Sequence, residues 1–198
     1  MSKSFGRGAA ALAVISIISK LLGALYRIPL TNVLGAEGMG VYQTVFPIFT
    51  VLLMICGGGM TGAVSRTVAK YSARGRHAEV KDIFLASSLP LLAFSIVAAT
   101  GVIVFRSGIA GLQGVPKASI AYLALCPSLV FCSVISVLRG IFQGRNMMIP
   151  SGISQLVEQG IKLALGLFFG KLMMPRGVEY AVFGALLGVA VSEIAAFI

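Results

Sequence analysis

The chain has 198 residues, of which 58% are hydrophobic and 11% are charged, and its mean hydropathy is +0.98. A water-soluble domain of this length cannot bury so much apolar surface, so the composition excludes a soluble globular domain and indicates a protein that crosses a membrane several times. The formal net charge is +10, but no soluble segment of the sequence combines basic residues with interleaved aromatic residues. Nucleic-acid binding is therefore not expected. The basic residues instead indicate the orientation of the protein in the membrane and an anionic ligand.

Six apolar segments follow one another along the chain. We expect transmembrane helices at about residues 8–34, 41–64, 83–105, 118–138, 149–169 and 180–198. The basic N-terminus precedes an apolar run without a signal-peptide cleavage pattern, so the first span is predicted to stay attached. The predicted fold class is all-α, a polytopic membrane bundle of six transmembrane helices over residues 1–198.

Lysine and arginine residues predict the orientation of this bundle. If the N-terminus and the loops at 66–81 and 139–145 face the cytoplasm, they hold nine of the 16 basic residues, including Arg139. Four lie in the opposite loops and three within the spans. The excess predicts that both termini are cytoplasmic.

Residues with common catalytic or metal-binding chemistry are scarce. The three cysteines lie inside apolar runs without metal-ligand spacing, and His77 is the single histidine. Nucleotide-binding, zinc-protease and hydrolase motifs do not occur in the sequence. We therefore expect neither an enzyme nor a bound cofactor or metal.

The first span carries a polar stripe. At 100° per residue, Ser16, Lys20, Gly23 and Arg27 fall within about 60° of one another on a helix. Each charge at the centre of a span costs about 2.5 to 3.5 kcal/mol, although long side chains reach toward the membrane surface. Lys20 lies deeper than Arg27, which is close enough to the outer end for its guanidinium to reach water.

A second stripe lies on the fifth span, where Ser151, Gln155, Glu158 and Lys162 share one face. Two interpretations are open. Glu158 forms an internal ion pair with Lys20 or with Lys162, or Gln155, Glu158 and Lys162 form the wall of a water-filled cavity that faces the first span. With three bases against one acid, such a cavity favours an anion such as phosphate or diphosphate.

Glycines mark further places of interest. Gly57, Gly58 and Gly59 stand in a row in the second span, where they predict a local break or close helix contact and are candidate gating glycines. The pairs Gly58 with Gly62, Gly166 with Gly170 and Gly184 with Gly188 have the spacing of helix-packing faces.

Three stretches carry a family resemblance. These are SKLLGALYRIPLTNVLGAEGMGVYQ, GGGMTGAVSRTVAKY and LRGIFQGRNMMIPSGISQLVEQ. Together they resemble the stage V sporulation protein B group of polysaccharide exporters. That group is related to the MurJ-type lipid II flippases, the Wzx-type flippases and the MATE drug exporters. The resemblance covers nearly the whole chain in order.

The resemblance implies a transporter of the bacterial cytoplasmic membrane with two six-helix lobes around a central cavity. It also implies an undecaprenyl-diphosphate-linked oligosaccharide or peptidoglycan precursor as substrate, moved to the outer leaflet by alternating access. In MurJ-type relatives, basic residues of the first span engage the diphosphate. Lys20 matches one such position, and Arg27 matches a second with one residue more between the two.

The chain is long enough for one lobe, so we expect its partners to be the bilayer, the lipid-linked anionic glycan and a C-terminal lobe or second polypeptide that the sequence lacks. Two other functions are considered. A MATE-like cation or drug exporter half would need a predominantly acidic cavity. A non-transporting membrane scaffold or remnant would depend on none of the charges within the spans.

Overall fold

The computed structural model describes residues 2–197, and the side chains of residues 2–5, 7, 9 and 77 are outside the description. Helices make up nearly all of this range, and no strand occurs in it, which confirms the all-α prediction. The α-helices are α1 (Ser2–Leu25), α2 (Arg27–Leu53), α3 (Met60–Ala73), α4 (Val80–Leu112), α5 (Ala118–Gly144), α6 (Met148–Met173) and α7 (Val178–Phe197). Three short helical turns lie between them: η1 (Met54–Gly58), η2 (His77–Glu79) and η3 (Met174–Arg176).

Four helical segments are long and apolar enough to cross a membrane, at residues 10–73, 80–112, 118–144 and 178–197. Helix α6 is not one of them, because its polar face, with Gln155, Glu158, Gln159 and Lys162, lowers its hydropathy. Several apolar helices therefore support the predicted multi-pass membrane protein. The number of six spans stays a prediction.

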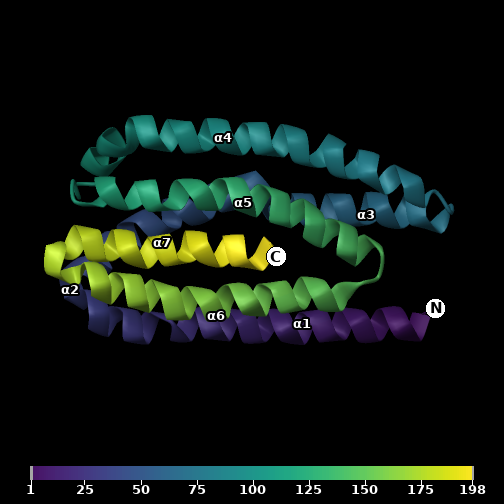
Figure 1. The fold of residues 1–198 in the computed structure, drawn as a ribbon, viewed down its shortest axis with the longest axis horizontal. Coiled ribbons are helices and arrows are strands. Elements are labelled where there is room, and N and C mark those ends of the chain that lie inside the picture. The colour runs from purple at the N-terminus through teal and green to yellow at the C-terminus, as the bar shows by residue number, and fades with distance from the viewer. Residues whose placement is uncertain (1, 198) are drawn as a thin grey trace.

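The long segment at residues 10–73 reverses its direction at Gly35. This residue has φ 68° and ψ −176°, a backbone conformation that glycine adopts and that other residues avoid. Figure 1 shows α1 and the beginning of α2 running one way along an edge of the molecule, whereas the rest of α2 and α3 run back. The break falls in the connection that the sequence predicts between the spans at residues 8–34 and 41–64.

The helices form an elongated bundle in which α5 and α7 occupy the centre. Helix α4 lies on one flank and α1 lies on the opposite flank beside α6 (Figure 1). Tyr122 and Leu129 of α5 and Leu186 of α7 are fully buried in the main hydrophobic core. By contrast, the flanking helices expose apolar side chains along much of their length, as expected where lipid is the solvent.

Glycines bring several helices into close contact. A Cβ atom at Gly184 would lie 2.5 Å from the Phe169 carbonyl oxygen, and one at Gly188 would meet the backbone of Gly166, so α6 and α7 pack closely there as predicted. The prediction for Gly58 with Gly62 is wrong. Among the described residues no atom of another element lies within 4 Å of a Cβ at Gly62, because this side of α3 faces outward.

A π-helical turn, η1, interrupts the helix at the three consecutive glycines. A Cβ atom at Gly57 would lie 2.5 Å from Ser136 Oγ and 3.2 Å from Cys132 Sγ, both on α5. Gly58 and Gly59 are exposed. The sequence predicts a local break or a close helix contact, and both are found at this place. A gating role for the glycines stays a prediction.

Candidate functional site: a cationic pair of cavities

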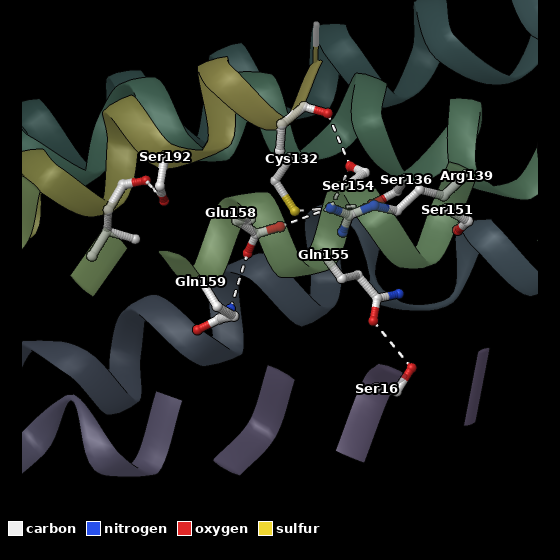
Figure 2. Close-up of polar contacts among 12 residues, drawn as sticks. Ser16, Cys132, Ser136, Arg139, Ser151, Ser154, Gln155, Glu158, Gln159 and Ser192 are labelled. Atoms are coloured by element: carbon white, nitrogen blue, oxygen red, sulfur yellow. Dashed lines mark hydrogen bonds and ion pairs between the residues drawn. The ribbon is translucent and has the colours of Figure 1, made fainter. Parts of the chain in front are cut away.

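A cavity of about 450 Å³ lies between α1 and α6, and we call it the α1–α6 cavity. Its lining comes from three helices: Ser16, Ser19, Lys20 and Gly23 of α1, Arg139 of α5, and Gln155, Glu158 and Gln159 of α6. The two polar stripes predicted from the sequence therefore face each other. Figure 2 shows Gln155 pointing from α6 toward Ser16 of α1. The Ser16 hydroxyl donates a hydrogen bond of 3.1 Å to Gln155 Oε1.

Small residues allow α1 to approach α6 at this cavity. A Cβ atom at Gly23 would lie 3.1 Å from Gln159 Oε1, which is tighter than an ordinary contact. Gly152, nearer the start of α6, makes a similar close contact, because a Cβ atom there would lie 2.8 Å from Ile15 Cδ1 of α1. Lys20 lies between these contacts and is exposed to the cavity. The α1 helix thus presents a primary amine to an opening whose other walls are polar.

Glu158 forms an ion pair with Arg139 and not with Lys20 or Lys162. The distance from Arg139 Nη2 to Glu158 Oε2 is 2.8 Å, and both side chains are about one fifth exposed, at 19% and 21%. Arg139 Nη2 also donates to Ser154 Oγ at 2.9 Å, and Ser154 donates to the Ala196 carbonyl oxygen at 2.9 Å (Figure 2). Within the described part of the chain, both ion pairs proposed from the sequence are therefore replaced by one that links α5 to α6.

Arg139 is also misplaced by the sequence prediction, which assigns it to a cytoplasmic loop. Helix α5 continues to Gly144, so Arg139 lies inside the helix and its side chain crosses to α6. Gly140 and Gly144 explain the continuation, because they let α3 pack against this last part of α5. The signal that would have located Arg139 is its position in the apolar, glycine-spaced run RGIFQG.

A second cavity of about 320 Å³ adjoins the first, and we call it the Arg27–Lys162 cavity. Gly23 lines both cavities. The remaining lining residues of the second are Ala24, Tyr26, Arg27, Tyr42, Phe46 and Lys162. The Arg27 Cζ atom lies 5.9 Å from the centre of the Phe46 ring, and Lys162 Nζ lies 5.4 Å from the same centre. One aromatic ring thus lies next to two cations.

The aromatic lining of this cavity is not predicted from the sequence. Tyr42 and Phe46 stack with ring centres 5.2 Å apart, and Lys162 Nζ also lies 6.0 Å from the Tyr26 ring. These rings hold the ends of Arg27 and Lys162 without neutralising their charge. In residues 2–197, no acidic side chain lies within ion-pair distance of Lys162. The lining of this cavity therefore contains two basic side chains and, among the described residues, no carboxylate.

Together, the linings of the two cavities contain four cations, Lys20, Arg27, Arg139 and Lys162, and among the described residues one carboxylate, Glu158. A second carboxylate, Glu193 of α7, belongs to neither lining and is buried, with only 5% of it exposed. A partly enclosed space with an excess of positive charge attracts anions. The candidate gating glycines Gly57, Gly58 and Gly59 line neither cavity.

A bundle of apolar helices that encloses charged, partly open cavities is typical of membrane transporters. Residues 5–198 match the family of polysaccharide biosynthesis proteins, and the chain belongs to this family. It is 29% identical over 197 residues to stage V sporulation protein B of Bacillus subtilis (strain 168), a match that covers 99% of this chain and 38% of that protein. The family resemblance seen in the sequence is thereby confirmed.

Two further relatives come from the same organism. The lipid II flippase MurJ is 31% identical over 206 residues, covering 95% of this chain and 38% of that protein. The uncharacterized membrane protein YabM is 28% identical over 179 residues, covering 90% and 33%. The chain thus spans less than two fifths of the length of these relatives. No solved structure matches it. These comparisons place the chain with membrane flippases and exporters and not with enzymes.

Proposed function

We propose that this chain forms one lobe of a flippase that carries a lipid-linked anionic glycan across the bacterial cytoplasmic membrane by alternating access. The relative named a lipid II flippase supports a substrate in which a sugar is attached to a lipid through a diphosphate. We propose an undecaprenyl-diphosphate-linked oligosaccharide or peptidoglycan precursor. A second lobe, which completes the cavity, would be its partner.

The proposed topology has six spans. The first comprises α1 and the beginning of α2 up to Gly35, the second runs from there through α3, and α4, α5, α6 and α7 provide the others. Both termini then lie in the cytoplasm, together with the basic segment between α3 and α4. In this arrangement α6 crosses the membrane despite its polar face, because that face lies against the cavities and not against lipid.

The observation that carries the proposal is the convergence of four cations from four helices, α1, α2, α5 and α6, on two adjoining cavities. A diphosphate has several oxygens that bind lysine as a point charge and arginine in a forked geometry. The same observation argues against a cation exporter, which would need an acidic cavity. Lys20 and Arg27 are the proposed diphosphate ligands, and Gln155 and Lys162 form the facing wall.

Binding of undecaprenyl diphosphate to the chain in lipid nanodiscs tests this proposal. Loss of one charge-assisted contact costs about 1.5 to 3 kcal/mol, so Lys20→Ala is expected to weaken binding by about 10-fold to 100-fold. Arg27→Ala is expected to act in the same direction. Lys171→Ala removes an exposed cation from the last turn of α6 and serves as the matched control. Unchanged binding by both cavity variants would contradict the assigned site.

A further inference from the structure

The Arg139–Glu158 ion pair stands in the wall of the proposed substrate cavity and not in a separate packing interface. Both residues line the α1–α6 cavity together with Lys20. The pair uses one terminal nitrogen of the guanidinium, Nη2, which also contacts Ser154. In the described part of the chain, the buried Nε of Arg139 has no hydrogen-bond partner. The guanidinium therefore keeps a donor that its protein neighbours leave unused.

A carboxylate and a phosphate compete for the same position on an arginine. Both present pairs of oxygens that match the forked donors of a guanidinium. Glu158 Oε2 lies 2.8 Å from Arg139 Nη2, where an oxygen of an anionic ligand in the cavity would bind. The carboxylate of Glu158 thus occupies an anion position, and its side chain is partly exposed in the lining of the cavity.

Glu158 is held on its other side by a weak contact. Gln159 Nε2 donates to Glu158 Oε1 at 3.5 Å, the limit of a hydrogen bond. One helical turn further along α6, Lys162 lies at the i+4 position, and within residues 2–197 no acidic side chain lies within ion-pair distance of it. This spacing brings a glutamate and a lysine on a helix within contact distance. A second cationic partner is therefore available to Glu158 without any movement of the helices.

We infer that Glu158 is a built-in occupant of an anion site on Arg139, which a diphosphate displaces. Arg139 then binds phosphate oxygens beside Lys20, while Glu158 turns toward Lys162. The inference rests on the proposed function, because it assigns to the same cavity a third cationic ligand and a competitor. Since the carboxylate must be displaced, a singly charged anion binds poorly, whereas a diphosphate contacts both Arg139 and Lys20. The competitor also returns to Arg139 when the substrate leaves and so favours release.

A purely structural role for the pair, as a link between α5 and α6, predicts a different response to mutation. Removal of the Glu158 charge would then loosen the bundle and leave anion binding unchanged or weaker. If Glu158 is a competitor, its removal lowers the apparent dissociation constant to the wild-type value multiplied by the fraction of time for which Arg139 is free in the wild type. For a pair closed about nine tenths of the time, Glu158→Gln strengthens binding by about tenfold.

The test measures binding of two probes, inorganic pyrophosphate and undecaprenyl diphosphate, to the 198-residue chain in nanodiscs of neutral lipid. We expect Glu158→Gln to strengthen binding, and Glu158→Asp, whose shorter carboxylate reaches Arg139 less well, to have a smaller effect in the same direction. Glu37→Gln, which removes the same charge at an exposed pair with Lys117, is the control and is expected to bind as the wild type does. Arg139→Gln is expected to weaken binding and to abolish the effect of Glu158→Gln in the double variant.

The outcomes separate the two proposals. If Glu158→Gln binds both probes more tightly than the wild type does, the inference is supported and the diphosphate alone is the ligand. If it binds only undecaprenyl diphosphate more tightly, the inference is supported and the prenyl chain is also required. Equal or weaker binding by both Glu158 variants, in a wild-type chain that binds, overturns the inference and leaves the proposed function standing. Absence of binding by the wild type and every variant, with helicity retained in circular dichroism, overturns both.

Discussion

The contact between α3 and α5 gives the sharpest prediction about stability. A Cβ atom at Gly144 would lie 2.6 Å from the Ser65 carbonyl oxygen and 2.7 Å from Val68 Cβ, both on α3. One at Gly140 would lie 2.8 Å from the Thr61 carbonyl oxygen. Backbone oxygens and Cβ atoms cannot rotate away, so the two helices must move apart to accommodate a methyl group.

We expect Gly144→Ala to destabilise the chain by about 1 to 3 kcal/mol, the usual cost of overpacking. For a protein of this size, that change lowers the melting temperature by about 2 to 10 °C. Gly140→Ala acts on the same interface, so the loss of unfolding free energy in the double variant is expected to be smaller than the sum of the losses in the two single variants. Thermal unfolding in detergent, followed by circular dichroism at the helix band, measures the shift.

Gly62→Ala is the matched control on α3. Among the described residues, no atom of another element lies within 4 Å of a Cβ at this position, and the residue is helical. Alanine is favoured over glycine in a helix by about 0.5 to 1 kcal/mol, so this variant is expected to melt at the same or a higher temperature. Equal melting temperatures for Gly144→Ala and Gly62→Ala would refute the close packing of α3 against α5.

Three further predictions concern the site and the topology. Arg139→Ala leaves the Glu158 carboxylate without its partner. It is therefore expected to lower the free energy of unfolding by about 2 kcal/mol more than Arg145→Ala, at the exposed end of the same helix, does. Equal unfolding transitions of the two variants would contradict a structural contribution of the pair. Lys20→Cys is expected to react with a charged, water-soluble thiol reagent because it lines an open cavity, and reaction no greater than in the wild type would show that water does not reach it. In intact cells a membrane-impermeant reagent should label Lys117→Cys and spare Arg74→Cys, and the reverse pattern would invert the proposed topology.

The sequence predicts much of the fold and of the α1–α6 wall because both depend on local patterns. Apolar runs define the helices, and the glycine-rich stretch around Gly35 marks the reversal. The helical spacing of Lys20 with Ser16, and of Gln155 with Glu158, places each pair on one face, and the structure brings these faces together. Such patterns need no knowledge of which helices are neighbours.

The features that the sequence does not predict depend on which helices pack against one another. Hydropathy ends the fourth span just before Arg139, yet packing of α3 against the glycines of α5 extends the helix and directs Arg139 to Glu158. In the same way, glycine spacing suggests Gly62 as a packing position, although that residue faces outward. The aromatic lining around Lys162 comes from Tyr42 and Phe46 of α2 and from Tyr26 just before it, and no periodicity connects these residues with α6.

Photocrosslinking tests most directly the central claim that the two cavities receive a lipid-linked diphosphate. The probe is undecaprenyl diphosphate with a photoreactive group at the diphosphate, and mass spectrometry locates the modified residues of the chain in nanodiscs. We predict modification within residues 16–27 of the first span and 155–162 of α6, reduced by unlabelled undecaprenyl diphosphate. Modification confined to the lipid-facing residues of α4, with none in these two segments, would contradict the account.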